Sequence, residues 1–234
     1  MSRLDGQRVA IVGASSGIGL ALAQLASREG ADLAMLSRSA EKLEAASRGL
    51  PAKVRVRPLD MLDRTDAVAA AAWLGPVDHL VLTAVADELV SRGPVGSLSP
   101  EQVERSLDKL RGYSNVVSAM AGQVSGSITL LSGASALKPP PGFAALAAAA
   151  ASIEGFARAL AGELAPVRVN VVMPGLVDTP IHRDRAETRA WAEANLPVRY
   201  FGQPADIADL ILAIATNRYV TGQTMVIDGG LVRI

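Results

Sequence analysis

Short apolar runs alternate with longer amphipathic stretches along the chain. The runs are mostly rich in Val, Ile and Leu, a composition typical of parallel strands buried on both faces. They cover residues 8–12, 32–37, 54–57, 79–83, 127–131, 167–172 and 224–227. Helical periodicity follows over residues 18–28, 40–48, 63–73, 100–122, 143–164 and 205–216. This alternation predicts an α/β fold, a doubly wound parallel sheet of seven strands with helices on both faces.

Composition indicates one globular domain over residues 1–234. The chain is 50% hydrophobic and 20% charged, and no linker, repeat or block of like charge divides it. Lys plus Arg (23) equals Asp plus Glu (23). This balance argues against a nucleic-acid or anionic-membrane partner and favours a neutral ligand or another protein. The expected partner is a small-molecule substrate.

Cysteine is absent, and the two histidines, His79 and His182, lie far apart in the sequence. We therefore expect no metal site and no disulfide. The first apolar run is too short for a signal sequence or a membrane span. Together these features predict a cytoplasmic location.

A glycine-rich turn links the first predicted strand to the first predicted helix. Gly13, Gly17 and Gly19 follow the strand directly, with Ser15 and Ser16 between them. Glycine lets the main chain approach a pyrophosphate closely, and the N–H groups that begin a helix meet its charge. The strand, turn and helix context predicts dinucleotide binding rather than a merely tight turn.

The end of the second strand indicates which dinucleotide binds. Ser37 stands where a ribose-binding carboxylate is expected, and Arg38 follows it. Because an arginine pairs with a 2′-phosphate that a carboxylate would repel, we predict NADP(H) in preference to NAD(H). Asp60, after the third strand, is expected to contact the adenine amino group or to cap the next helix.

Four ordered motifs resemble the classical short-chain dehydrogenase/reductase family over essentially the whole chain: the glycine turn at 13–19, Asp60-Met61, the loop 173–180 and the closing segment 221–230. The resemblance implies a Rossmann-type domain, a nicotinamide cofactor, and a homodimer or homotetramer built on the helices 100–122 and 143–164. The expected cofactor-binding residues are Gly13, Ser15, Ser16, Gly17, Ile18, Gly19, Ser37, Arg38, Asp60, Met61, Thr83, Ala84, Pro174, Gly175 and Thr179.

The family's catalytic residues do not recur in the matching register. The segment 154–164 resembles the one that follows the catalytic lysine, which places the family's Tyr at Leu146 and its Lys at Ala150. The family's Ser falls on Gly133 and its Asn on Lys109. The family's Asn-Asn-Ala-Gly is Leu-Thr-Ala-Val at residues 82–85.

Two hypotheses follow from this pattern. In the first, the protein is an NADP(H)-dependent oxidoreductase that acts on a small carbonyl, alcohol or conjugated substrate with non-standard residues. Lys109 is then a relocated cation, with Ser132 and Ser135 as nearby hydroxyls. Tyr113 is expected to be a packed helix residue, and His182 a loop residue. The alternative for Lys109 is a surface or interface lysine with a packed stem. In the second, the chain is a nucleotide-binding pseudoenzyme acting as a redox sensor, scaffold or hetero-oligomer subunit.

Residues 181–203 are expected to form a lid over the substrate. Trp191 and Leu196 are its candidate apolar lining, and the alternative for Trp191 is an anchor that holds the lid to the body.

Overall fold

The computed structural model describes residues 2–51, 53–85, 91–180 and 186–234. Its sheet contains seven parallel strands in the order β3-β2-β1-β4-β5-β6-β7, which confirms the predicted doubly wound α/β fold. The strands are β1 (Arg8–Val12), β2 (Asp32–Ser37), β3 (Val54–Pro58), β4 (Val77–Leu82), β5 (Val124–Leu131), β6 (Arg168–Pro174) and β7 (Thr224–Ile227).

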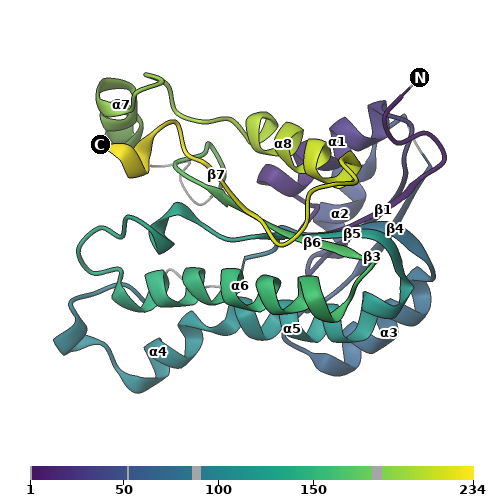
Figure 1. The fold of residues 1–234 in the computed structure, drawn as a ribbon, viewed down its shortest axis with the longest axis horizontal. Coiled ribbons are helices and arrows are strands. Elements are labelled where there is room, and N and C mark those ends of the chain that lie inside the picture. Colours follow the sequence, from purple (N-terminus) through teal and green to yellow (C-terminus); the bar gives the residue numbers. More distant parts are fainter. Residues whose placement is uncertain (1, 52, 86–90, 181–185) are drawn as a thin grey trace.

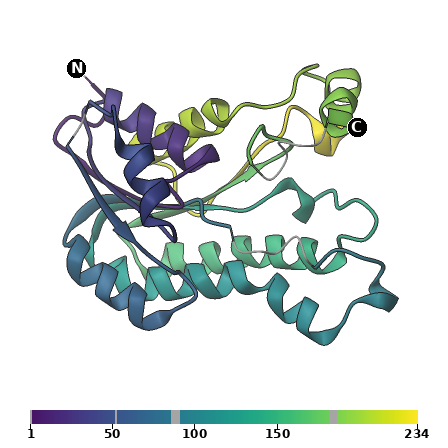
Figure 2. The ribbon, with the colours of Figure 1, turned by 180° about the vertical axis from the view of Figure 1, so that it is seen from behind.

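Helices cover both faces of the sheet (Figures 1 and 2). They are α1 (Gly17–Arg28), α2 (Ala40–Ser47), α3 (Arg64–Leu74), α4 (Pro100–Ser106), α5 (Asp108–Met120), α6 (Ala144–Glu163), α7 (Ala186–Asn195) and α8 (Pro204–Thr216). A large apolar core joins one face to α3, α5 and α6, and a second joins the other face to α1, α2 and α8. Short 3₁₀ turns occupy Val95–Ser97, Ala121–Gln123, Ala134–Ala136 and Leu231–Arg233.

The topology determines where a ligand can bind. The chain moves outward from β1 to β2 and β3, then returns to place β4 on the other side of β1. The loops at the carboxyl ends of β1 and β4 therefore diverge and leave a crevice, the usual ligand position in such sheets.

The helix predicted over residues 100–122 is interrupted, so that prediction is wrong in one respect. α4 ends at Ser106 and α5 begins at Asp108, with Leu107 as the joint. Two contacts tighten the joint: the Ser106 hydroxyl donates to the Val103 carbonyl at 2.6 Å, and the Leu107 amide donates to the Glu104 carbonyl at 3.0 Å. The Leu107 amide bond has the three-residue spacing of a 3₁₀ turn in place of the regular α-helical spacing, so the helix is interrupted at this residue.

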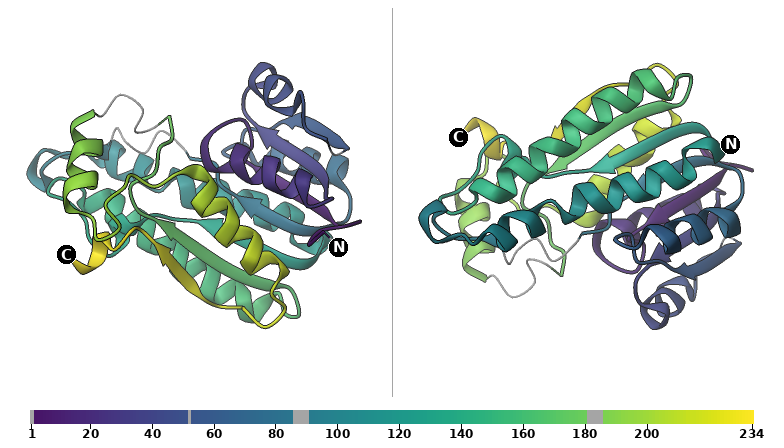
Figure 3. Two further views of the ribbon diagram at one scale, coloured as in Figure 1. Left: turned by 90° about the horizontal axis from the view of Figure 1, so that it is seen from above. Right: turned by 90° about the horizontal axis from the view of Figure 1, so that it is seen from below.

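The Ala-rich segment forms the 20-residue helix α6, which lies beside α5 (Figure 3). By length and composition, with a mean hydropathy of 1.3, α6 could also cross a membrane. In the fold it is a core helix, because Leu146, Ile153 and Leu160 are buried on the side facing the sheet. Its outer face consists largely of small residues and is exposed.

Candidate active site

A cavity of about 1220 Å³ lies at the carboxyl ends of the central strands. Every predicted cofactor-binding residue lines it, from the glycine turn after β1 to the loop after β6. The three tentative catalytic residues, Lys109, Ser132 and Ser135, line the same cavity. The fold therefore brings together predicted residues from seven separate segments of the chain.

The glycine turn is packed too closely for a side chain at two of its positions, Gly13 and Gly19. Gly13 has φ +97°, and a Cβ at this position would lie 2.5 Å from the backbone nitrogen of Ala84. A Cβ on Gly19 would collide with the Gly13 carbonyl oxygen. At the N-terminus of α1, Ser16 makes no side-chain capping bond, and the first turn contains no acidic residue. The N–H groups of this turn are therefore suited to a phosphate.

Polar groups at the adenosine end fit a phosphorylated ribose. The Ser37 hydroxyl is buried and has no hydrogen-bond partner in the structure. Arg38 and Lys42 are exposed on the same rim of the cavity. Asp60 lines the cavity, and its carboxylate accepts from the Leu62 amide at 2.9 Å. The alternative that Asp60 caps the next helix is wrong, because Asp63 caps α3.

The opposite end of the cavity holds Lys109. Its side chain is only 7% exposed and its Nζ lies 5.8 Å from the centre of the Tyr113 ring, so the alternative of a surface lysine is wrong. The Ser132 hydroxyl donates to the Ala150 carbonyl at 2.7 Å. A Cβ at Gly133 would lie 3.6 Å from the Ser135 Oγ, so the two positions are neighbours. Among the described residues that line the cavity, none is Tyr, His or Glu.

Tyr113 and His79 lie outside the cavity lining, as packed residues. The Tyr113 hydroxyl donates a hydrogen bond to the Leu82 carbonyl oxygen at 2.8 Å. His79 is bonded on both ring nitrogens, to Ser127 Oγ at 2.8 Å and to Gln7 Oε1 at 2.7 Å. Burial lowers the pKa of His79 to about 4, and the nearby Arg168 adds to this effect. His182 lies outside the described residues.

The described part of the predicted lid contains α7, a helix that the sequence analysis did not predict. Trp191 lines the cavity and is 45% exposed. The prediction that Leu196 lines the same cavity is wrong: Leu196 is buried against Ala192 and Phe201 and holds the segment to the body. Arg189 strengthens this attachment, because it pairs with Asp178 at 2.8 Å and stacks 4.8 Å above the Phe201 ring.

Sequence reasoning missed several side chains that line the cavity. They are Ser39, Lys42, Leu62, Arg92, Lys138, Phe143, Thr188 and Leu231. Lys42 had a local signal, since it lies in the first turn of α2, four residues after Arg38. The others come from loops and helix ends whose position depends on contacts with distant segments.

Comparisons with known proteins agree with this geometry. Residues 13–232 match a family profile described as enoyl-(acyl carrier protein) reductase. A 3-oxoacyl-[acyl-carrier-protein] reductase of Thermotoga maritima is 34% identical, over 98% of this chain and 99% of its own. The human dehydrogenase/reductase SDR family member 4 is 31% identical, over 98% of this chain and 90% of its own.

Solved structures show the same architecture. The NADPH-bound structure of a short-chain oxidoreductase from Pseudomonas aeruginosa, described as containing an atypical catalytic centre, matches 97% of each chain at 29% identity and a TM-score of 0.89. The structure of the MalC reductase/Diels-Alderase of Malbranchea aurantiaca covers 100% of this chain and 99% of its own, at 27% identity and a TM-score of 0.91. The fold and cavity define a Rossmann-type α/β protein. The chain belongs to the short-chain dehydrogenase/reductase family of oxidoreductases.

Proposed function

We propose that this protein is an NADP(H)-dependent oxidoreductase that acts on a small carbonyl, alcohol or conjugated substrate with non-standard catalytic residues. One observation carries the proposal: a lysine ammonium, on Lys109, is buried in the cavity that Ala150 also lines. In the family register the lysine belongs at position 150. A charge buried beside an apolar wall acts strongly on a substrate because little water screens it.

The residues present fit an NADP(H) molecule. The α1 N-terminus and the glycine turn would hold the pyrophosphate, while Ser37, Arg38 and Lys42 would hold the 2′-phosphate. Thr83, Pro174, Gly175 and Thr179 line the region expected to contact the other end of the cofactor. When bound, NADPH supplies a hydride to an electrophilic carbon. The NADPH-bound relative and the unpaired Ser37 hydroxyl support this choice of cofactor.

The chain's own groups must stabilise the charge that develops on the substrate oxygen. The Lys109 ammonium offers both a positive charge and a proton. Because the Ser132 hydroxyl proton is donated to the Ala150 carbonyl, the Ser132 oxygen can only accept from a substrate. Ser135 is the better donor, since its hydroxyl adjoins the Gly133 position that the family gives to a serine. We assign Lys109 as the cation and Ser135 as the hydroxyl donor.

NADPH consumption with a panel of carbonyls, quinones and conjugated alkenes tests this proposal. Lys109→Met keeps the stem and removes the charge, and we expect kcat to fall roughly hundredfold, with a smaller loss for Ser135→Ala. Lys53→Met, an exposed cation that does not line the cavity, is the matched control and should keep full activity. Full activity in Lys109→Met, or no turnover despite tight NADPH binding, would overturn the proposal.

We infer that the protein forms a homodimer or homotetramer through α4, α5 and α6. The outer face of α6 exposes Ala148, Ala151, Gly155 and Ala159, small residues that let another helix approach closely. Light scattering should show a smaller assembly for Ala151→Arg than for the control Ala69→Arg, on the exposed face of α3. An unchanged mass in Ala151→Arg would contradict this interface.

A further inference from the structure

We propose that Lys138 determines substrate specificity, because its contact with Leu231 closes one side of the cavity and limits the length of a substrate's apolar part. The inference rests on the proposed function, which assigns the opposite end of the cavity to the adenosine part of the cofactor. Both residues line the cavity, although 93 positions separate them in the chain. The Lys138 ammonium donates to the Leu231 carbonyl oxygen at 3.1 Å. Because no ligand atom fits between two groups in hydrogen-bond contact, the cavity cannot extend between these two walls.

A well-ordered C-terminal turn presents the Leu231 carbonyl. The Asp228 carboxylate accepts from two amides, that of Gly230 at 2.9 Å and that of Val232 at 2.8 Å. The Leu231 amide donates to the Asp228 carbonyl at 3.2 Å, which closes the turn. Gly230, with φ +90°, supplies the left-handed backbone that this course of the chain requires. The Leu231 carbonyl therefore has a fixed direction.

The C-terminal turn packs against the segment that follows α7, and Figure 1 shows the C-terminus beside that helix. A Cβ on Gly230 would lie 2.5 Å from the Pro197 Cγ, so the two segments touch at this point. Leu231 also packs against the apolar cluster around Phe201 that holds the segment to the body. These contacts hold Leu231 from two sides. Lys138 is therefore the part of this wall that a substitution can remove while the turn stays folded.

Lys138 approaches from the loop between β5 and α6. Its amide donates to the Ala134 carbonyl at 3.0 Å, and three prolines, at residues 139–141, follow it and also line the cavity. The proline ring fixes φ near about −65°, which restricts the course of the loop. The four-carbon stem of the lysine then spans from this loop to the C-terminal turn. The side chain thus connects two walls that come from remote parts of the chain.

Apolar side chains line the space that leads to this contact. Phe143, Leu146 and Trp191 are on the same cavity. Each methylene that leaves water for an apolar cavity strengthens binding about fourfold. Displacing the Lys138 ammonium from the Leu231 carbonyl would instead weaken binding about tenfold, since hydrogen bonds from charged donors are among the stronger ones. The affinity for an unbranched apolar chain should therefore rise with its length only until the chain reaches this contact.

Calorimetric titration with neutral 2-alkanones, from 2-pentanone to 2-undecanone, tests the inference. With NADP⁺ saturating, wild-type affinity should rise with each added carbon and then level off within the series. Lys138→Ala removes the stem together with its hydrogen bond, so the rise should continue, and 2-undecanone should bind about tenfold tighter than it binds the wild type. 2-Pentanone is too short to reach the contact and should bind both proteins equally.

Three further variants separate this contact from general effects. Lys138→Arg keeps a long stem and a donor, so it should keep the wild-type length limit. Lys53→Ala, which removes an exposed lysine away from the cavity lining, should do the same. Asp228→Asn replaces an acceptor oxygen of the C-terminal turn by an amide group that cannot accept, so the limit should relax through Leu231. Asp228 is thus a positioning residue, and its variant decides the question if Lys138→Ala does not fold.

The inference is overturned if the wild type and Lys138→Ala level off at the same chain length, if the wild type shows no limit, or if it binds none of the ketones. The titration measures binding and is repeated without NADP⁺, so it depends neither on turnover nor on cofactor affinity. A limit that moves in Lys138→Ala while the substrate panel gives no NADPH consumption supports this wall and rejects the proposed function. Turnover that requires Lys109, with the same limit in both proteins, rejects the wall alone.

Discussion

At the residue scale, several positions that have little or no side chain help to shape the cavity. Gly13 lets the turn after β1 touch the segment after β4, and the missing side chain at Gly133 leaves Ser135 facing the cavity. Ala150 likewise leaves space on α6 that a longer residue would fill. The sequence indicated these positions by motif and register, but only the structure shows which side chains adjoin them.

Gly13→Ala should be among the most damaging single changes. It combines a φ of +97° with a Cβ 2.5 Å from the Ala84 nitrogen, so we expect the free energy of unfolding to fall by roughly 3 kcal/mol or more. Gly49→Ala is the matched control: φ is +83°, but no atom lies within 4 Å of the added Cβ. Its cost should be about 1 kcal/mol. Urea unfolding measures the free energy of unfolding of both variants. Equal losses in Gly13→Ala and Gly49→Ala would show that the close approach of Gly13 to Ala84 is unimportant.

Arg38→Ala should change cofactor choice. Loss of the guanidinium on the adenosine rim is expected to weaken NADPH binding about tenfold and to leave NADH binding unchanged, because NADH has no 2′-phosphate. Fluorescence titration with both cofactors measures the effect, with Arg48→Ala, exposed and away from the cavity lining, as the control. If the Arg38 variant lost affinity for both cofactors equally, the assigned role would be wrong.

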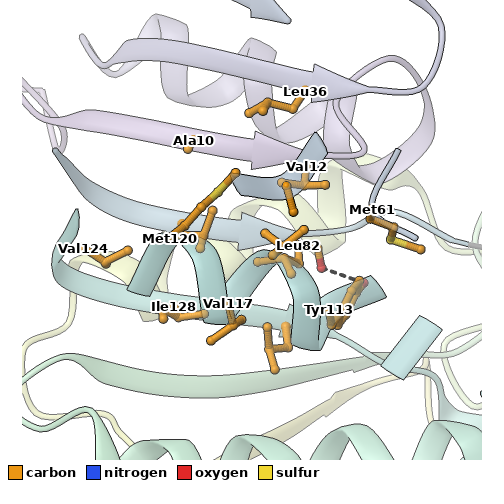
Figure 4. Close-up of a cluster of buried hydrophobic side chains, with 14 of the residues drawn as sticks. Ala10, Val12, Leu36, Met61, Leu82, Tyr113, Val117, Met120, Val124 and Ile128 are labelled. Carbon is orange, nitrogen blue, oxygen red and sulfur yellow. Dashed lines mark hydrogen bonds between the residues drawn. The ribbon is translucent and has the colours of Figure 1, made fainter. Parts of the chain in front are cut away.

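At the element scale, specific polar contacts align α5 with the strand ends that form the cavity. Tyr113 is fully buried in the core, and its hydroxyl lies 2.8 Å from the carbonyl oxygen of Leu82 (Figure 4). The same hydroxyl lies 3.0 Å from the Ala84 carbonyl oxygen and 3.2 Å from that of Leu131. Gly112 allows the same helix to pack tightly on Met61, since a Cβ there would lie 2.6 Å from the Met61 Cγ. These contacts place Lys109, one turn earlier, in the cavity.

Tyr113→Phe should lower the free energy of unfolding by about 1–2 kcal/mol. The ring shape is kept, so the loss comes from leaving buried carbonyl groups short of a donor. Tyr219→Phe removes the same atom from a side chain that is 99% exposed and should change stability by less than about 0.5 kcal/mol. Chemical denaturation compares them, and a neutral Tyr113→Phe would mean that the hydroxyl does not hold α5 in place.

At the scale of the whole molecule, buried His79 links global stability to pH. Its folded pKa is about 4, below the ordinary value of 6.5, because burial opposes the charged form. Between these two values the unfolded chain binds a proton that the folded chain does not, so stability rises with pH across this window. The full effect is about 3 kcal/mol, present above pH 6.5 and lost as the pH falls toward 4.

Denaturation curves at several pH values measure this linkage. In His79→Gln the glutamine amide can still bond to Ser127 or Gln7, but the titrating group is gone. The slope of stability against pH should therefore become shallower between pH 4 and 6.5. An unchanged slope in His79→Gln would show that other groups cause the dependence.

Local pattern alone determined much of this protein. Three strands, β1, β2 and β7, have the predicted bounds, and the glycine turn lies where the sequence placed it. Strand periodicity and turn chemistry depend on neighbouring residues, so they can be deduced from short windows. The position of the proposed cofactor-binding residues along one cavity was predictable for the same reason, because most of them belong to short motifs that follow a strand.

Tertiary structure alone decided the rest. The stacking of Arg92 on Phe143, the bond from Lys138 to Leu231, the break at Leu107 and the inward turn of Leu196 each depend on segments that are remote in sequence or on how an element packs. Such contacts reflect the shape and volume of the assembled core, which no local window contains. Local sequence therefore predicted which segments line the cavity, while packing decided which charged side chains stand beside them.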